Sequence, residues 1–306
     1  MEFILRELSY TFSIDTRGLV GINFQVEKLK SHLAIGLNDV RIIGIRGMGG
    51  MGKTTLARFV YDMVSNQFEA CSFIANVWEV SKKCGLLPLQ QLLLNELLTE
   101  GDMNIHGIDN GVLMIKNRLH HKKVLLVLDD VNELDQLKKL AGERDWFGPG
   151  SRVIITTRDE HLLMTHKVDG TYEAKGLNYD EALHIFSLKA FHKDYPPKLY
   201  LNVSKHFVQY ANGLPLAIEV LGSFLFNRSI DEWKSAFDRL KEFSERKNFN
   251  VLQISFEGLQ EIEKEIFLNI KCFFNHNNQE SVIAILDCLE LYTEIGLRVL
   301  TDKFSH

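Results

Sequence analysis

Nine consecutive residues, Gly47–Thr55, have the types and spacing of a phosphate-binding loop. Their sequence, GMGGMGKTT, fits the pattern GxxxxGK[ST] directly after a strand-like run and directly before a helical one, which is the context that the pattern requires. Glycines let backbone N–H groups converge on phosphate oxygens, Lys53 brings a positive charge to the β and γ positions, and Thr54 offers a hydroxyl to Mg²⁺. A glycine-rich turn arising by chance is the alternative, and both flanking elements argue against it. The predicted nucleotide contacts in this loop are Gly47, Gly49, Gly50, Gly52, Lys53, Thr54 and Thr55.

Two adjacent acids, Asp129 and Asp130, follow an apolar stretch that begins at Lys122 and reads KKVLLVL. A parallel strand beside the phosphate loop would present Asp129 at its carboxyl end, where it is expected to hold Mg²⁺ directly or through water. Asp130 is then placed to orient or activate a hydrolytic water, which makes it the candidate catalytic residue. The alternative is that Asp130 caps a helix and Asp129 is merely solvated.

A third apolar run, Ser151–Thr156, ends in a polar turn that carries Arg158. From a neighbouring strand this arginine is expected to reach a γ-phosphate and report which nucleotide is bound, although spacing alone supports a surface ion pair equally well. Further along, Gly213–Ala217 reads GLPLA and places Pro215 at the first turn of a helix, where its missing N–H costs nothing. On physical grounds alone, Pro215 marks a helix start.

These motifs need alternating strands and helices to position them, and the first half of the chain has that pattern. Short β-branched runs separated by stretches of helical spacing indicate βαβ units and a doubly wound parallel sheet covered on both faces. The predicted strands are Val40–Ile45, Cys71–Val77, Lys123–Leu128 and Ser151–Thr156, and the predicted helices are Lys53–Asn66, Leu89–Leu98 and Val112–Leu119. The predicted fold class is therefore α/β, of the P-loop NTPase type.

From Asn178 onward the apolar spacing is helical throughout. A small helical bundle is predicted from Asp180–Phe191, Leu199–Ala211, Pro215–Phe226 and Asp231–Leu240, and further short helices from Phe249–Phe256, Gln260–Phe273, Ser281–Leu289 and Thr293–Leu300. We divide the chain at these changes of pattern into an N-terminal extension (1–17), a nucleotide-binding domain (18–175), a helical subdomain (176–245) and an incomplete third subdomain (246–306).

Composition excludes several classes of protein. The chain has 306 residues, and 35 basic against 40 acidic side chains give a net charge of −5, so no basic field favours nucleic acid or an anionic membrane. Its apolar runs fall far short of the ~20 residues of a membrane span. Charges near the N-terminus do not fit a signal peptide, and four cysteines without CxxC spacing indicate a reducing compartment. A cytoplasmic protein is expected, with nuclear shuttling left open.

Taken in order, the motifs resemble the NB-ARC region of plant disease-resistance receptors, a branch of the STAND class of P-loop ATPases. Seven blocks resemble those of the family, in the family's order, and they occur along nearly the whole chain. They read GMGGMGKTT, FEACSFIANVWEVS, KKVLLVLDDVN, GSRVIITTRD, YEAKGLNYDEALHIFSLKAF, GLPLAIEVLGSFL and IFLNIKCFF. The second block, together with Asn132 after Asp-Asp-Val, is similar to the subgroup that carries an N-terminal Toll/interleukin-receptor domain.

The resemblance implies roles that spacing alone does not give. In this family the ADP-bound state is closed and inactive, whereas exchange for ATP opens the subdomains and permits oligomerisation for immune signalling. The roles that it implies are Val20 and Gly21 against adenine, Pro215 on the adenine side, Lys53 and Thr54 at phosphate and Mg²⁺, Asp129 in the metal site, Asp130 as the hydrolytic acid and Arg158 as the γ-phosphate sensor. The third subdomain is expected to be winged-helix-like.

The sequence also departs from the family. Asn269 and Lys271 stand where many relatives have an acid and an alanine, so this helix is expected to pack differently. The chain ends at His306, before the Met-His-Asp motif whose His contacts the ADP phosphate, and it encodes neither a signalling domain nor leucine-rich repeats. A truncated product, a fragment or an adaptor form is therefore expected.

Three functions are consistent with these patterns. The preferred one is a switch module that binds ADP or ATP and is at most a slow ATPase. A productive ATPase or phosphotransferase would need an acceptor pocket and lid arginines that the sequence does not identify. The third is an adaptor or pseudo-switch that pairs with full-length receptors without regulated hydrolysis. The expected partners are nucleotide and, beyond it, other immune receptors or a second copy.

Overall fold

The computed structural model describes residues 22–98 and 105–245. These residues belong to two compact units, one running from Ile22 to Lys175 and one that includes Gly176 and the residues after it. Several predicted features lie outside the described residues: the extension at 1–17, Val20, Gly21, and the third subdomain at 246–306 with its predicted helices. Within the described ranges, no helix has the length and apolar character needed to cross a membrane.

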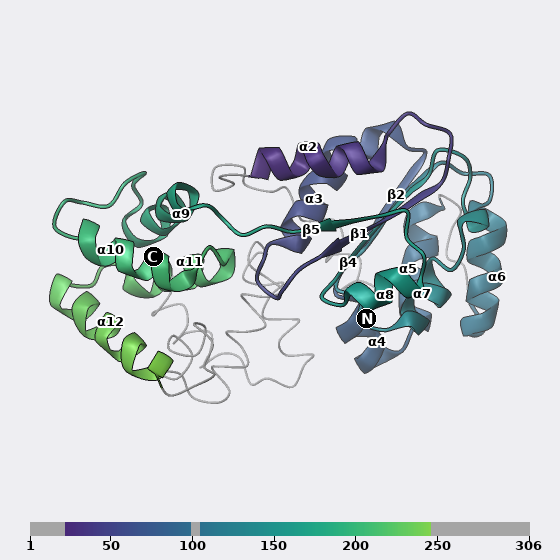
Figure 1. The fold of residues 1–306 in the computed structure, drawn as a ribbon. Helices are drawn as coiled ribbons and strands as arrows, with labels where there is room; N and C mark the ends of the chain where they lie inside the picture. Colours follow the sequence, from purple (N-terminus) through teal and green to yellow (C-terminus); the bar gives the residue numbers. More distant parts are fainter. Residues whose placement is uncertain (1–21, 99–104, 246–306) are drawn as a thin grey trace. The chain divides into compact units, whose positions relative to one another are not determined.

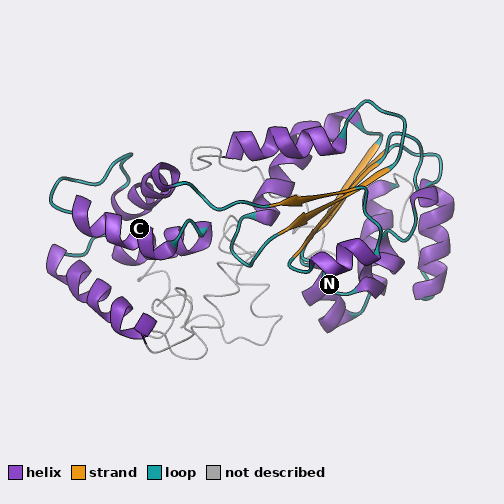
Figure 2. Cartoon of the chain, in the orientation of Figure 1, coloured by secondary structure: helices purple, strands orange, loops and turns teal. Residues whose placement is uncertain are grey.

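Five parallel strands form a single sheet in the order β2-β3-β4-β1-β5 (Figure 1). Their bounds are β1 Arg41–Arg46, β2 Ala70–Ile74, β3 Val124–Leu128, β4 Arg152–Thr157 and β5 Gly170–Glu173. Every residue of β3 and β4 is buried, as is typical of a parallel sheet with helices on both faces, and Figure 2 shows this arrangement. The predicted α/β fold class is confirmed.

The sheet order places β4 between β3, which leads to the paired acids, and β1, which leads to the phosphate loop. One expectation about the sheet is wrong. The strand predicted as Cys71–Val77 ends at Ile74. Asn76 has a left-handed backbone with φ of 51°, and Val77 begins a helix instead.

Helices cover both faces of the sheet. Leu126 of β3 and Ile155 of β4 share a core with Leu93 and Leu137, which come from α5 and α7, and α2 and α3 pack on each other and on β1. The helices described in this unit are α2 Ile22–Leu33, α3 Lys53–Val64, α4 Val77–Cys84, α5 Leu87–Leu97, α6 Ile108–Leu119, α7 Leu134–Leu140 and α8 Glu160–Thr165.

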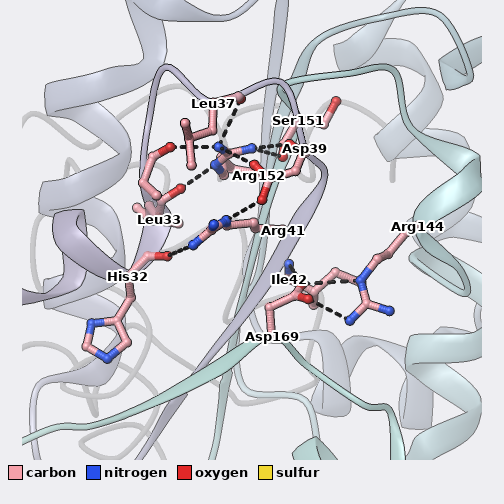
Figure 3. Close-up of polar contacts among 11 residues, drawn as sticks. His32, Leu33, Leu37, Asp39, Arg41, Ile42, Arg144, Ser151, Arg152 and Asp169 are labelled. Atoms are coloured by element: carbon pink, nitrogen blue, oxygen red, sulfur yellow. Dashed lines mark hydrogen bonds and ion pairs between the residues drawn. The ribbon is translucent and has the colours of Figure 1, made fainter.

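A buried arginine anchors the connection between α2 and β1 (Figure 3). Arg152, the first residue of β4, is 0% exposed. Its guanidinium donates hydrogen bonds to the Asp39 carboxylate and to five carbonyl oxygens, those of Leu33, Ala34, Leu37, Asp39 and Ser151. The last carbonyls of a helix lack partners within the helix, so Arg152 satisfies the end of α2 and fastens it to the sheet.

Two carboxylates, those of Asp39 and Asp169, complete the polar network at the amino ends of the strands. Asp39 accepts a hydrogen bond of 2.6 Å from Arg41 Nε, and this bond, together with the charge of Arg152, lowers the pKa of the Asp39 carboxyl. Asp169 accepts the Ile42 N–H at 2.8 Å and pairs with Arg144 at 2.8 Å. The start of β1 is thus tied to the residues that precede β5.

The described part of the second unit is a set of four helices, α9 Tyr179–Phe191, α10 Leu201–Ala211, α11 Pro215–Leu225 and α12 Ile230–Glu245. This confirms the helical subdomain predicted after the sheet. Asn178 begins α9 with a capping box, in which its side chain accepts the Glu181 N–H at 2.9 Å and the Glu181 carboxylate accepts the Asn178 N–H at 2.8 Å.

Trp233 of α12 is the centre of this helical core. It is 0% exposed, its indole N–H donates to the Leu225 carbonyl at 2.9 Å, and four aromatic rings surround it at centroid distances of 5.0 to 5.9 Å. Those rings belong to Phe186, Phe191, Tyr200 and Phe207.

We expect Trp233→Phe to lower the free energy of unfolding by about 1–3 kcal/mol. The smaller ring leaves a void, and the buried Leu225 carbonyl loses the indole donor and keeps the longer bond from the Arg228 N–H at 3.3 Å. Urea denaturation followed by far-UV circular dichroism measures the change, with Tyr195→Phe as the control because Tyr195 is 76% exposed. Equal midpoints for wild type and Trp233→Phe would contradict this account of the core.

Candidate functional site

The topology brings three of the predicted segments to one edge of the sheet. The loop Gly47–Thr55 follows β1, Asp129 and Asp130 follow β3, and Arg158 follows β4. Since the strands are parallel and β4 lies between β1 and β3, their carboxyl ends meet at the same edge. In open α/β sheets, ligands bind at this edge.

The glycines of the loop occupy positions that other residues would strain. Gly52 has φ of 78° and stands immediately before α3, and Gly50 also has φ of 78°. At Gly49, a Cβ would lie 3.2 Å from the guanidinium carbon of Arg158. The loop therefore turns tightly onto the start of α3 and lies directly against Arg158, as a phosphate-binding loop requires.

Lys53, the first residue of α3, is a buried cation with an exposed fraction of only 8%. Its ammonium donates to the Met48 carbonyl at 3.0 Å. Burial lowers the pKa of Lys53, and the positive charge of Arg158 lowers it further, while Asp130 and Asp129 oppose the shift. Two positive charges that repel each other at this loop fit a polyanionic ligand, because a bound anion would relieve both the desolvation and the repulsion.

Asp129 is the acid behind the loop, and it is 1% exposed. One of its oxygens, Oδ1, accepts hydrogen bonds from Thr54 Oγ1 at 2.8 Å and from Thr156 Oγ1 at 2.6 Å. Burial raises the pKa of the Asp129 carboxyl, and the two hydroxyls oppose that shift. A carboxylate beside a hydroxyl is a set of oxygen ligands that fits Mg²⁺, which takes few protein ligands when phosphates supply the others.

Asp130 has a strained backbone, with φ of 53°. Its N–H donates to Thr156 Oγ1 at 2.9 Å, and its carboxylate lies 4.0 Å from Arg158 Nε. The helix that follows is capped by Glu133 in a capping box with Gln136. The helix-cap interpretation of Asp130 is therefore wrong.

The other predicted residues are Thr55, Pro215, Val20 and Gly21. Thr55 is an exposed residue of α3, and Pro215 is the first residue of α11 in the second unit, so the predicted helix start is confirmed. Val20 and Gly21 lie outside the described residues. The adenine contacts assigned to Pro215, Val20 and Gly21 stay predictions.

Sequence reasoning missed two features of the site. Thr156 contacts both acids, and the only signal was the pair of threonines, Thr156 and Thr157, between the apolar residues of β4 and Arg158. The amino end of α4 is the other: the Val77 N–H donates to the Asp129 carbonyl at 2.8 Å, and the Trp78 N–H to the Asp130 carbonyl at 3.2 Å. The free amides of a helix N-terminus therefore hold the backbone of the two acids.

Comparison with a solved structure supports the fold. The crystal structure of Cdc6p from Pyrobaculum aerophilum has a TM-score of 0.54 to this chain, covering 97% of this chain and 89% of that one. The two sequences are 14% identical, so the likeness concerns the fold alone.

Comparison of sequences gives matches of much higher identity. Disease resistance protein RUN1 from Vitis rotundifolia is 44% identical over 286 residues, which cover 93% of this chain and 22% of that protein. TMV resistance protein N from Nicotiana glutinosa is 42% identical over 294 residues, which cover 94% of this chain and 25% of that protein. The chain thus spans about a quarter or less of the length of these two relatives.

Two family descriptions match the chain itself. The winged-helix domain described as Disease resistance protein Roq1-like matches residues 260–305, which include Asn269 and Lys271, outside the described residues. The NB-ARC domain matches residues 22–195, which is more than half of the chain and includes the loop, both acids and Arg158. Together with the site geometry, this match shows that the chain belongs to the NB-ARC family.

Proposed function

We propose that this chain is a switch module that binds ADP or ATP with Mg²⁺ and serves defence signalling by a plant immune receptor. The observation that carries the proposal is the meeting of Lys53, Arg158 and the Thr54–Asp129 pair at one edge of the sheet. Membership of the NB-ARC family supports nucleotide binding. The relatives named as disease resistance proteins support the signalling role.

Each residue of the site has a distinct task in this proposal. The loop glycines and Thr55 lie along the phosphates, and Lys53 exchanges the Met48 carbonyl for phosphate oxygens. Thr54 and Asp129 hold Mg²⁺, which when bound neutralises phosphate charge. Asp130 orients a water toward the terminal phosphate, and Arg158 contacts that phosphate when ATP is bound. Any turnover is slow, so binding is the main function.

The rest of the chain has the task of responding to the nucleotide. We assign residues 18–175 to nucleotide binding, 176–245 to the helical subdomain and 246–306 to the third subdomain, with 1–17 as an extension. Pro215, Val20 and Gly21 contact adenine. The exchange of ADP for ATP alters the arrangement of the subdomains, so that other immune receptors or a second copy of the chain bind. We place this event in the cytoplasm, with shuttling of the protein to the nucleus. The winged-helix match supports the third assignment.

Calorimetric titration of the purified chain with ADP, in Mg²⁺ and then in EDTA, tests the proposal. We expect saturable binding of one nucleotide that is tighter in Mg²⁺, and mass spectrometry of the freshly purified protein should find ADP or ATP. Absence of binding under both conditions, with no nucleotide carried through purification, would overturn it.

Asp130→Asn separates binding from hydrolysis. We expect ADP affinity within about threefold of wild type, since this half-exposed acid does not hold the phosphates, and ATP turnover per bound nucleotide at least about tenfold lower, since the carboxylate that orients water is lost. Release of labelled phosphate measures the turnover. Asp159→Asn is the control, because Asp159 lies next to Arg158 and caps α8, a task that asparagine performs equally well. Loss of binding in Asp130→Asn without a change in turnover per bound nucleotide would refute the division.

A further inference from the structure

We propose that Thr156 is a positioning residue whose single hydroxyl fixes both acids of the site and thereby controls the Mg²⁺-dependent part of nucleotide affinity. The inference rests on the proposed function and extends it to a residue outside the phosphate loop and the acid pair. Thr156 is the fifth residue of β4 and is 0% exposed.

The direction of each hydrogen bond follows from the chemistry of the groups. The Asp130 N–H can only donate, so Thr156 Oγ1 accepts from it at 2.9 Å. The hydroxyl proton is then free to be donated to Asp129 Oδ1, at 2.6 Å. The Thr156 carbonyl also accepts the Val131 N–H at 2.9 Å. One residue of β4 therefore holds three consecutive residues after β3.

The two bonds of the hydroxyl have different consequences. The bond to Asp129 stabilises a buried carboxylate, which otherwise depends on Thr54. The bond from Asp130 holds a residue whose φ of 53° is unfavourable for a side chain larger than glycine. Without the hydroxyl, Asp129 loses one of its two hydroxyl donors and the Asp130 amide loses its acceptor. The orientation of the metal-holding carboxylate is then no longer fixed.

The chain supplies a matched control in the next residue. Thr157 is the same residue type, is also 0% exposed and is also the acceptor of a backbone amide, that of Asp159, at 3.0 Å. Successive side chains of a strand point to opposite faces. The partner of the Thr157 hydroxyl is the amide of Asp159, the residue that caps α8, and not one of the two acids of the site. Thr156→Val and Thr157→Val therefore each remove one buried threonine hydroxyl. The Thr156 hydroxyl bonds to Asp129 and Asp130, whereas the Thr157 hydroxyl bonds to Asp159.

The experiment measures the ADP dissociation constant of the full chain in EDTA and in Mg²⁺, and compares among variants the ratio of the constant in EDTA to the constant in Mg²⁺. Thr156→Val is expected to reduce this ratio about tenfold, mainly through weaker binding in Mg²⁺, because a charge-assisted hydrogen bond to the metal-holding carboxylate is lost. Thr156→Ser, which keeps the hydroxyl, and Thr157→Val should keep the wild-type ratio within about twofold. If Thr156→Val is insoluble, Thr156→Ala replaces it and the same loss is required.

The outcomes separate this inference from the proposed function. Wild-type protein that binds no ADP overturns the proposed function and with it the inference. Wild-type protein that binds ADP more tightly in Mg²⁺, with an unchanged ratio in Thr156→Val, overturns the inference alone. A purely structural role would weaken binding equally with and without Mg²⁺, and that result also counts against it.

Discussion

Lys53→Ala is expected to weaken ADP binding about 100-fold, equivalent to ~2.7 kcal/mol, without unfolding the protein. Lys53 is 8% exposed and is the first residue of α3, so its ammonium is already largely desolvated where the phosphates are expected. A buried charge that is prepared before the ligand arrives contributes more to affinity than one that must be drawn out of water. Isothermal titration with ADP measures the loss.

The ligand-free Lys53→Ala protein should be no less stable than wild type. Burial and Arg158 lower the pKa of Lys53, so at neutral pH its positive charge costs free energy in the folded protein that it does not cost in the unfolded chain. Removing the charge removes that cost. A ligand-free melting temperature equal to or above that of wild type is the expected sign.

Two further variants define the effect. Lys53→Arg keeps the charge but not the compact ammonium, and we expect its affinity to lie between those of wild type and Lys53→Ala. Lys83→Ala removes a surface lysine that pairs with Glu79 at 2.8 Å and should leave ADP binding unchanged. Undiminished ADP affinity in Lys53→Ala would show that the loop does not bind the phosphates.

Arg152→Met has the largest expected effect on stability, a loss of about 3–5 kcal/mol. The guanidinium is 0% exposed and donates to five carbonyl oxygens and one carboxylate, and methionine fills its space without supplying a donor. The carbonyl of Leu33, a fully buried residue at the end of α2, then loses the donor that Arg152 supplies. Thermal denaturation should show a melting temperature lower by about 10 °C.

Arg144→Met is the matched control for Arg152→Met. Arg144 belongs to the same polar network, which Figure 3 shows, but its side chain is 44% exposed and it pairs with Asp169, which is also partly exposed. A pair in contact with solvent contributes about 1 kcal/mol or less, so the melting temperature should fall much less. Similar losses in the two variants would show that burial of Arg152 is not what makes it important. Because Arg152 begins β4 and the site lies beyond its end, ADP affinity below the melting temperature should change in neither variant.

The phosphate loop, the paired acids and Arg158 could be predicted because each follows a short run of buried, apolar residues. Such runs identify the central strands, and parallel strands place their ends together whatever their order. The order itself was not accessible. Nothing in the run Val124–Leu128 says that β4, rather than β1, is its neighbour, because both strands offer equally apolar partners.

The errors arose where distant contacts override local pattern. The run Cys71–Val77 is apolar enough for one strand, yet the strand ends at Ile74 because the amides of Val77 and Trp78 bond to the carbonyls after β3. The edge strand β5 has one buried residue, Tyr172, and so has no apolar run by which to predict it. Thr156 could not be singled out from the sequence because its partners, Asp129 and Asp130, follow a different strand.

The hydrogen bond from the Trp78 amide to the Asp130 carbonyl also gives the protein an optical reporter. Of its three tryptophans, Trp146 and Trp233 are buried in apolar cores, whereas Trp78 is half-exposed with the Lys82 ammonium 5.0 Å from its ring. The emission of an indole depends on nearby charge and on water. We expect that a rearrangement of the acids on nucleotide exchange changes the intrinsic fluorescence of Trp78, so that exchange of nucleotide could be followed in real time on the unlabelled protein.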